Sequence, residues 1–323
     1  MKAAVVTRYG PPEVVRIADL PMPQPGPGEV LIRIHASTVA SGDWRLRSGT
    51  APRGFGLIIR LAFGLRGPRQ PVLGTELSGI VEATGPGVTR FAPGDAVLAF
   101  CGVTMRCHAE YRVVKADAAI VAKPATLSHA QAAALSFGGT TALHYLRDKA
   151  RLQAGERLLV IGASGAVGSA AVQLGRYLGA EVSTLTSAAN TALMRQIGAD
   201  RTLDYTSDDY TAEAARYDVI MDCVGATRFR RALPALAPAG RFLMVAGDLP
   251  QMLGALRPGP QGKRCLGGPA PERAADVALL ADLAAQGACV PLIDSSYPFD
   301  QIAQAHARVE TGRKRGNVVV TMV

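Results

Sequence analysis

The sequence predicts an α/β protein that combines a doubly wound parallel sheet with a second, β-rich domain. Three observations lead to this fold class. Residues 1–122 contain short apolar segments between Pro/Gly turns, residues after about 123 alternate between strand and helix patterns, and residues 157–179 read as a strand, a glycine turn and a helix in immediate succession. With 323 residues and 48% apolar content, the chain is long enough to build two domains with substantial cores.

The N-terminal part has the pattern of a β-rich domain. Apolar segments with the length of strands stand at 3–7, 30–35, 78–83 and 96–100. The proline-rich run 21–30 predicts an extended connector, because proline disfavours helix there and restricts the residue before it. No alternation of strand and helix occurs in this part, which separates it from the later domain.

Residues 49–71 look like an insertion in this β-rich part. Its apolar residues can share one helical face, formed by Leu57, Ile58, Leu61, Ala62 and Leu65. An amphipathic lid over a pocket and a membrane-surface helix are both open, the second because arginines flank the segment. Ordinary packing against the domain is the commoner outcome for such a helix, so the role of the segment is left open.

The unit at 157–179 has the pattern of a dinucleotide-binding turn. Four consecutive apolar residues, 158–161, indicate a strand buried on both faces. In the turn, Ala163 stands where the first glycine of the fingerprint is usual, Gly165 lets a phosphate approach the backbone, and Gly168 permits close packing of helix on strand. The N–H groups at the start of the helix would then hold a pyrophosphate without a charged side chain.

The strand and helix alternation continues beyond this unit. Further strands are predicted at 181–185, 201–204, 218–223 and 241–245, with a helix at 190–197. Gly225 and Gly247 follow the last two strands, at the sheet edge where ligands bind. Residues 249–271 are rich in Gly and Pro and indicate only a strand near 264–266. Helices at 272–286 and 299–310 then precede a final strand, 317–322, which we expect to return to the β-rich domain.

Composition disfavours several classes of protein. No apolar run approaches the ~20 residues of a membrane span, and the N-terminal sequence shows no apolar signal core. The net charge of +9 comes from 29 arginines and 6 lysines, but these are spread along the chain with few aromatic residues among them, so nucleic-acid binding is unexpected as the main function. The five cysteines have no disulfide-framework spacing. We expect a cytoplasmic protein with free thiols and no membrane partner.

Five motifs follow one another along nearly the whole chain: PQPGPGEVLI, GTELSGIVEATGPGVTRFAPGDAV, LLVIGASGAVGSAAVQLGRYLGAEV, YDVIMDCVG and VETGRKRGNVVV. In this order they resemble the medium-chain dehydrogenase/reductase superfamily, and within it the zinc-independent quinone oxidoreductase-like branch. The resemblance implies a GroES-like β-barrel substrate domain at 1–122, completed by about 289–323. It also implies a Rossmann NADP-binding domain at 123–288, an active site between the two domains, and a homodimer.

Metal binding is not expected. The resemblance places the catalytic zinc ligands of the zinc-dependent relatives at Ala40, Thr75 and about Ser136, and none of these residues binds zinc well. Cys101 and Cys107, even with the neighbouring His108, are too few for a structural zinc site. Without a metal to polarise an alcohol, the resemblance implies hydride delivery to an electron-poor acceptor, either a quinone or an α,β-unsaturated carbonyl.

The end of the second strand of the nucleotide domain predicts NADPH rather than NADH. NAD-binding domains usually place an acid there to hold the ribose 2′-hydroxyl, whereas this chain has Thr186 and Ser187 and no acid from 182 to 199. The resemblance adds Tyr205 beside the 2′-phosphate. Asn190 replaces a lysine that is common in the relatives, so positive charge would come from Arg195 or from 313–315, and the expected preference is modest.

Two sets of candidate site residues result. The cofactor is expected to contact Thr141, Ala163, Ser164, Gly165, Ala166, Val167, Gly168, Thr186, Ser187, Asn190, Tyr205, Val224, Gly225, Gly247 and Asn317. The substrate pocket is expected to draw on Ser41, Asp43, Trp44, Arg45 and Thr75, with Thr140 and Thr141 from the domain junction.

No catalytic acid or base is assigned among these residues. Asp43 matches a family position, but a carboxylate there is equally typical of a turn or of a pair with an arginine. The relatives often carry Asn and Tyr where Ala40 and Arg45 stand, and His144 and Tyr145 are read as packing residues. A catalytically weak NADPH-binding sensor or regulatory protein would carry the same fingerprint and is the alternative function.

Overall fold

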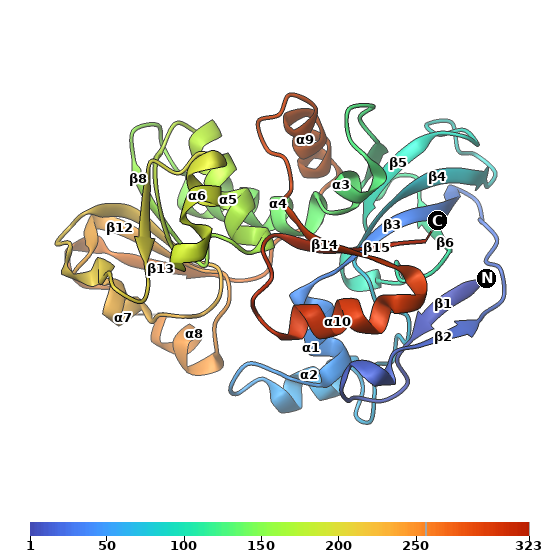
Figure 1. The fold of residues 1–323 in the computed structure, drawn as a ribbon, viewed down its shortest axis with the longest axis horizontal. Helices are drawn as coiled ribbons and strands as arrows, with labels where there is room; N and C mark the ends of the chain where they lie inside the picture. Colours follow the sequence, from blue (N-terminus) through green and yellow to red (C-terminus); the bar gives the residue numbers. More distant parts are fainter. Residues whose placement is uncertain (256, 323) are drawn as a thin grey trace. The chain divides into compact units, whose positions relative to one another are not determined.

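The structure is a computed structural model that describes residues 1–255 and 257–322, and it divides into two compact units (Figure 1). Unit 1 consists of Met1–Ala51, Gly56–Phe137 and the described residues from Glu272 onward, and unit 2 of Pro52–Phe55 and Gly138–Pro271. The two units are defined by contacts within the chain. The domain boundaries at 122 and 288 instead rest on the change of sequence pattern near residue 123 and on the family resemblance, and they stay a prediction.

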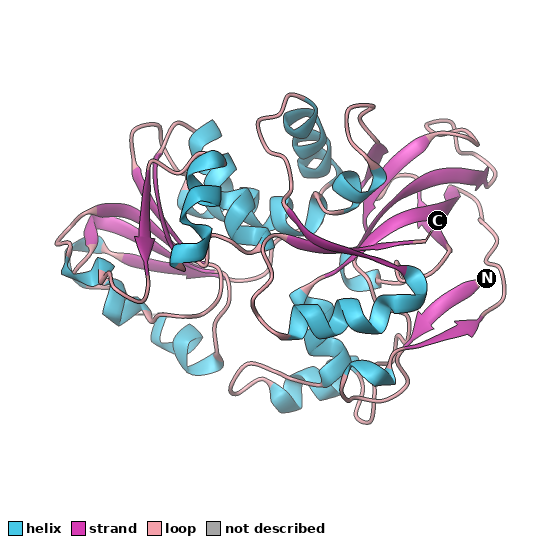
Figure 2. Ribbon diagram, in the orientation of Figure 1, coloured by secondary structure: helices cyan, strands magenta, loops and turns pink. Residues whose placement is uncertain are grey.

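A seven-stranded sheet forms the centre of unit 1 (Figure 2). Its strands lie in the order β14 (Ile293–Pro298), β15 (Asn317–Thr321), β3 (Glu29–Val39), β4 (Glu76–Thr84), β5 (Ala96–Phe100) and β7 (Ile120–Ala122), and β6 (Tyr111–Lys115) also pairs with β3. All neighbours are antiparallel except β14 and β15, which are parallel. The final strand therefore returns to the β-rich part, as predicted.

The strand β3 organises unit 1 because most of its 11 residues are buried. Val30, Ile32 and Ile34 lie in a core shared with β4 and β5, whereas Val39 lies in a second core with α10 (Ile302–Glu310). Unit 1 also contains the antiparallel pair β1 (Lys2–Val5) and β2 (Arg16–Asp19), and the helices α1 (Ser41–Ser48), α2 (Gly56–Phe63), α3 (His129–Ala133) and α9 (Ala274–Ala285).

Unit 2 is built on a six-stranded parallel sheet. The strands lie in the order β10 (Arg201–Asp204), β9 (Glu181–Thr186), β8 (Arg157–Ile161), β11 (Tyr217–Asp222), β12 (Leu236–Met244) and β13 (Arg264–Gly267). In chain order this is the arrangement 3-2-1-4-5-6 of the Rossmann fold, whose ligands bind where the order reverses, here between β8 and β11. The predicted doubly wound sheet is confirmed.

The helices of unit 2 are α5 (Ala166–Tyr177), α6 (Thr191–Gln196), α7 (Phe229–Ala232) and α8 (Leu249–Ala255). In addition, α4 (Ser136–Leu143) begins at the end of unit 1 and continues as a π-helical turn, His144–Ala150. Strand β8 is buried from Leu158 to Ile161, as expected for a parallel strand covered on both faces, and nine of the 12 residues of α5 are buried.

Several predicted elements differ in their bounds or were missed. The strand expected at 241–245 begins at Leu236, and the helix expected at 299–310 opens with the 3-10 turn Phe299–Gln301. The Gly/Pro-rich segment 249–271 holds α8 as well as β13, and its residue 256 lies outside the described residues. Both α1 and β14 escaped prediction because their largely polar sequences lack clear apolar periodicity. Among the described helices, none is long and apolar enough to cross a membrane.

Candidate functional site

The turn after β8 leaves open space at Gly165. Gly162 has φ +74°, which an L side chain rarely adopts, and it turns the chain out of the strand. Gly165 is the N-cap of α5, and a Cβ built on it would meet only the Gly162 carbonyl oxygen, at an ordinary 3.6 Å. No side chain of the described residues caps this helix. The first N–H groups of α5 therefore face a space that suits a phosphate.

Gly168, in contrast, has no space for a side chain. A Cβ there would lie 2.3 Å from the Gly162 carbonyl oxygen and 2.7 Å from the Cα atom of Ala163. The glycine therefore lets α5 pack closely on the end of β8, as the fingerprint predicts. Gly138 plays a similar part in α4, because its Cβ would meet the Ala166 carbonyl oxygen at 2.7 Å. This close approach brings the segment with Thr140 and Thr141 to the start of α5.

The end of β9 carries a cluster of neutral polar side chains. The Thr186 hydroxyl donates to Ser164 Oγ at 3.3 Å, and Asn190 Nδ2 donates to Thr186 Oγ1 at 3.3 Å and to Ser187 Oγ at 3.2 Å. Asn190 is only 8% exposed, and its Oδ1 atom has no hydrogen-bond partner among the described residues. The structure thus brings four predicted cofactor residues together, and one of their buried polar atoms is left for a ligand.

Tyr205 lies beside this cluster. Its backbone N–H donates to the Thr186 carbonyl oxygen at 3.1 Å, and its side chain is 63% exposed. Asp204 lies beyond the acid-free stretch 182–199 and pairs with Thr186 across β9 and β10. The Asp204 carboxylate accepts the Thr206 N–H at 3.0 Å, and it adds negative charge near the expected 2′-phosphate site. Arg195, on the last turn of α6, is exposed.

A buried carboxylate shapes the loop after β11. Asp222 accepts hydrogen bonds from four backbone N–H groups, those of Val224, Gly225, Ala226 and Thr227, at 2.8–3.3 Å. Burial raises the pKa of Asp222, and these four donors act in the opposite direction. The predicted residues Val224 and Gly225 are thereby fixed at the switch point, next to Gly162, whose Cβ would meet Val224 Cγ1 at 2.6 Å. Sequence analysis did not identify Asp222 as the organiser of this loop.

Asp43 is a positioning residue in the structure. Its side chain is fully buried, and its two carboxylate oxygens accept the backbone N–H groups of Ala40, at 2.8 Å, and Gly74, at 2.9 Å. The carboxylate thus ties the start of α1 to the segment that leads into β4. This geometry favours the turn role over that of an acid or base, because both oxygens are already engaged.

The other pocket candidates are less constrained. Ser41 is exposed, and burial lowers the pKa of the half-buried Arg45. The indole N–H of Trp44 and the hydroxyl of Thr75 are both buried without a hydrogen-bond partner in the part of the chain that the structure describes. They are two of several buried polar groups of unit 1 that lack such a partner, together with groups of His35, Arg47, Arg112 and His306, although buried polar groups normally find partners.

Glu76 follows Thr75 and was not predicted as a site residue. Its carboxylate is buried, and it accepts the Thr38 hydroxyl at 2.5 Å and the Phe137 N–H at 2.6 Å. Desolvation by burial raises the pKa of Glu76 to about 7, against the lowering effect of these two hydrogen bonds. Glu76 is therefore fixed by its own carboxyl group, and Gly74 is fixed by its hydrogen bond to Asp43. Thr75 lies between these two fixed residues.

The residues at the family's zinc positions are unsuited to a metal. Ala40, the N-cap of α1, has no ligand atom in its side chain, and the neutral hydroxyl groups of Thr75 and Ser136 are weak zinc ligands. Within residues 1–255 and 257–322, no group of three His, Cys, Asp or Glu side chains could hold a metal ion. Cys101 and Cys107 are buried, the Cys107 thiol donates to the Met105 carbonyl oxygen at 3.8 Å, and the His108 ring bonds the Thr38 carbonyl oxygen at 2.9 Å.

Three further candidates have structural partners. The Tyr145 hydroxyl donates to the carbonyl oxygens of Met244, at 3.0 Å, and Gly268, at 2.7 Å, and burial raises its pKa to about 12. His144 Nδ1 lies 3.1 Å from an Asp148 oxygen. The side-chain amide of Asn317, in unit 1, donates to the Leu292 carbonyl oxygen at 3.1 Å. Gly247, in unit 2, lies against Met244, whose Sδ atom would be 2.5 Å from an added Cβ.

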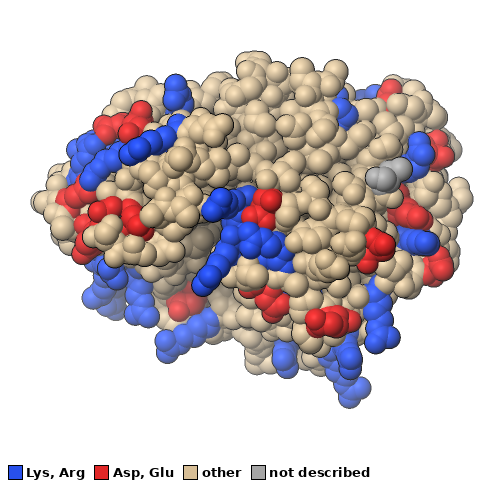
Figure 3. Space-filling model, in the orientation of Figure 1, with Lys and Arg blue, Asp and Glu red and all other residues tan. Residues whose placement is uncertain are grey.

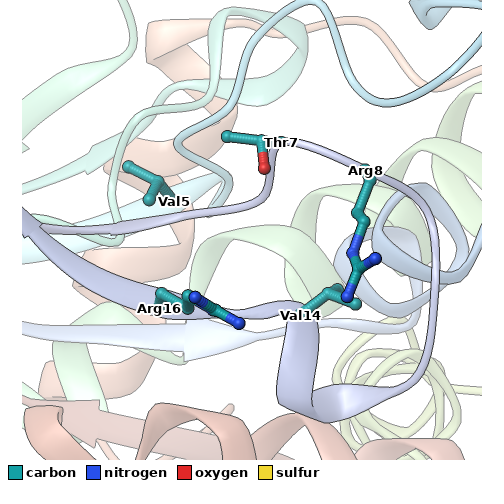
Figure 4. Close-up of a pocket in the computed structure, with 5 residues that line it drawn as sticks. All are labelled: Val5, Thr7, Arg8, Val14 and Arg16. Carbon is teal, nitrogen blue, oxygen red and sulfur yellow. The ribbon is translucent and has the colours of Figure 1, made fainter.

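One surface hollow lies apart from all these residues. It is about 390 Å³ in volume and is lined by Val5, Thr7, Arg8, Val14 and Arg16, from β1, the loop after it, the 3-10 turn Pro12–Val14 and β2 (Figure 4). Both arginines are exposed, and none of the lining residues belongs to the predicted cofactor or substrate sets. We assign it no part in the site.

Comparison with known proteins identifies the family. Residues 26–152 match the family model of the alcohol dehydrogenase GroES-like domain, and residues 197–320 match that of the zinc-binding dehydrogenases. The chain is 31% identical over 336 residues to quinone oxidoreductase from Rattus norvegicus, covering all of this chain and 98% of that one. It is also 35% identical over 318 residues, 93% of its length, to the pikromycin polyketide synthase component PikAII from Streptomyces venezuelae, of which it spans only 8%.

Solved structures agree with these matches. The quinone oxidoreductase from Coxiella burnetii superimposes with a TM-score of 0.88 at 26% identity, covering all of this chain and 99% of that one. The mycobacterial protein Rv1454c, solved in complex with NADPH, gives a TM-score of 0.82 at 29% identity over 99% of both chains. The chain belongs to the medium-chain dehydrogenase/reductase superfamily, in its quinone oxidoreductase-like branch, and is an oxidoreductase that uses a nicotinamide cofactor.

Proposed function

We propose that the protein is an NADPH-dependent reductase that transfers a hydride to a quinone or an α,β-unsaturated carbonyl without a metal. The observation that carries this proposal is the pairing of an open helix N-terminus at Gly165 with a cluster of neutral polar side chains at the end of β9. The relative from Rattus norvegicus named quinone oxidoreductase supports the acceptor class, and the NADPH complex of Rv1454c supports the cofactor.

The cofactor fits the residues of unit 2. The first N–H groups of α5 and the space at Gly165 would hold the pyrophosphate, as helix N-termini commonly do. Thr186, Ser187 and Asn190, with Tyr205 beside them, would take the 2′-phosphate by neutral hydrogen bonds. After an amide flip of Asn190, Nδ2 would donate to the phosphate and Oδ1 would accept one of the two hydroxyls, which leaves the other hydroxyl to donate to the phosphate. Asp204 and the absence of a lysine at 190 keep the expected preference for NADPH modest.

The substrate side requires a donor for the oxygen that gains charge. The bound nicotinamide supplies the hydride, and a quinone or enone needs no Lewis acid to accept it. We propose that the Thr75 hydroxyl and the Trp44 indole N–H, both without partners among the described residues, donate hydrogen bonds to the acceptor oxygen. Asp43 and Glu76 act through Thr75 by fixing the backbone on either side of it.

Turnover separates this proposal from its alternative. Purified protein is mixed with NADPH and a panel of quinones, enones, simple ketones and alcohols, and the absorbance of NADPH is followed. We expect oxidation with the quinones or enones and none with simple ketones. Tight NADPH binding without turnover on any acceptor would instead favour the catalytically weak sensor. The homodimer, which rests on the resemblance, and the cytoplasmic location, which rests on the composition of the chain, stay proposals. Sedimentation of the purified protein tests the first.

A further inference from the structure

The helix α2 presents an apolar face to solvent. Leu57, Ile58 and Leu61 are 70%, 54% and 55% exposed, and Leu65, in the loop that follows, is 62% exposed. At 100° per residue, the three helical side chains lie within one third of the helix circumference. The predicted helix forms, but its leucines do not pack on the domain as the commoner outcome would require. They form an outward face, which we define as Leu57, Ile58, Leu61 and Leu65.

The opposite side of α2 is anchored to unit 1. Ile59 and Phe63 are partly buried, and Phe63 packs against the core that contains Val39 and α10. The Tyr9 hydroxyl donates to the Gly64 carbonyl oxygen at 2.6 Å, and Arg69 Nη1 donates to the Ala62 carbonyl oxygen at 3.3 Å. Because apolar residues on the inward side already hold the helix, those on the outward face are not needed for folding.

The stretch of sequence that contains this face carries charges of a single sign. Residues 44–75 contain no Asp or Glu and six arginines, at positions 45, 47, 53, 60, 66 and 69. Of the arginines nearest in sequence to the outward face, Arg60, Arg66 and Arg69 are exposed, and the Arg60 guanidinium lies 5.8 Å from the centre of the Tyr9 ring. On the face of the molecule drawn in Figure 3, basic and acidic side chains lie beside one another in several places, and much of the rest of that face is uncharged. Exposed apolar side chains with arginines close to them in sequence are typical of helices that bind the interface of anionic membranes.

We propose that α2 and the loop after it dock on the surface of an anionic lipid bilayer. The outward face would enter the region between headgroups and acyl chains, and Arg60, Arg66 and Arg69 would contact lipid phosphates. A second copy of the chain fits less well, because it would bring one acid-free, arginine-rich segment against another. The proposal concerns attachment to a surface, replaces the expectation that no membrane is a partner, and does not depend on the identity of the substrate.

Vesicle flotation tests the docking. The full-length protein is mixed with vesicles of phosphatidylcholine alone or of equimolar phosphatidylcholine and phosphatidylglycerol, and the bound fraction is measured at low and high salt. We expect binding to the anionic vesicles only, weakened by salt. Leu57→Glu with Leu61→Glu should weaken binding by about tenfold or more, and Arg60→Gln and Arg66→Gln by about fivefold each, which corresponds to ~1 kcal/mol per arginine.

A matched control separates docking from general surface effects. Tyr177→Glu adds one carboxylate, half the charge of the double leucine variant, on a residue that is 52% exposed at the end of α5, in unit 2, and should leave vesicle binding unchanged. Unchanged thermal unfolding of each variant shows that it is folded. The proposal is wrong if the wild type ignores anionic vesicles, or if the double leucine variant binds them equally well. If the wild type does not bind vesicles but self-associates, and the leucine substitutions abolish this self-association, the partner of the outward face is a second copy of the chain.

Discussion

The two glycines of the turn after β8 should respond to substitution in opposite ways. Gly165 has φ −76°, and a Cβ on it meets one atom at 3.6 Å, so Gly165→Ala and Gly165→Asp should keep the fold with a stability change within about 0.5 kcal/mol. A Cβ on Gly168 would overlap the Gly162 carbonyl oxygen at 2.3 Å, and overpacking of this kind costs about 1–3 kcal/mol or more. Only the Gly165 variants therefore report on the cofactor alone.

The size of the binding defect depends on the charge that is introduced. A carboxylate about 4 Å from a phosphate, at an effective dielectric constant of about 20, opposes binding by roughly 4 kcal/mol, which is about a thousandfold in Kd. Gly165→Ala adds only a methyl group at the point of approach. It should weaken NADPH binding less than Gly165→Asp does.

Fluorescence titration with NADPH, together with thermal unfolding, checks these expectations. We expect the order wild type, Gly165→Ala, Gly165→Asp in decreasing affinity, with similar melting temperatures, and a clearly lowered melting temperature for Gly168→Ala. A folded Gly165→Asp variant with unchanged affinity would show that the pyrophosphate does not bind at this helix N-terminus.

Three further predictions concern cofactor choice, metal and pH. Thr186→Asp should lower the ratio of kcat/KM for NADPH to that for NADH by about tenfold or more, because a carboxylate would face the 2′-phosphate; an unchanged ratio contradicts that site. EDTA should leave turnover unchanged, since Ala40, Thr75 and Ser136 offer no zinc ligand; activity lost on chelation and restored only by zinc refutes this. The pKa of Glu76 is raised from 4.5 to about 7, so the folded protein retains a proton that the unfolded chain releases. The stabilising effect is complete below pH 4.5 and is lost as the pH rises to about 7. The free energy of unfolding should therefore fall by up to ~3 kcal/mol over this range. In urea titrations at several pH values, Glu76→Gln should reduce the dependence of this free energy on pH. An equally strong pH dependence in the variant would show that other groups cause it.

The fold was predictable from sequence where local signals were strong. Strand β8, its glycine turn and α5 are consecutive in the chain, so apolar runs and glycine spacing were enough to predict them. The same holds for β15, whose apolar run VVV marks a strand without indicating its partner, and the family resemblance supplied that partner. Strand β14 was missed because IDSSYP is largely polar, and it is placed by parallel pairing with β15.

The cofactor candidates in unit 2 were predictable to a similar degree. Ser164, Thr186, Ser187 and Asn190 form one hydrogen-bonded cluster, because the turn after β8 and the end of the adjacent strand β9 meet at the same sheet edge. Asp222 and Asp204 were missed for different reasons. Asp222 acts only through backbone N–H groups of its own loop, and Asp204 lies on the third strand of the unit, beyond the part of the sequence that the fingerprint covers.

The substrate candidates show why a matched family position does not by itself assign a role. Asp43 was singled out by resemblance, yet its carboxylate is fully buried and accepts the backbone N–H groups of Ala40 and Gly74, so it fixes the backbone. Glu76 has its partners at Thr38 and Phe137, separated by 38 and 61 residues along the chain, which no local pattern reveals. Between these two carboxylates, the hydroxyl of Thr75 is buried and has no partner among the described residues. A donor held in this way does not need to reorganise as charge develops on an acceptor oxygen, which is the property that the proposed reduction without a metal requires.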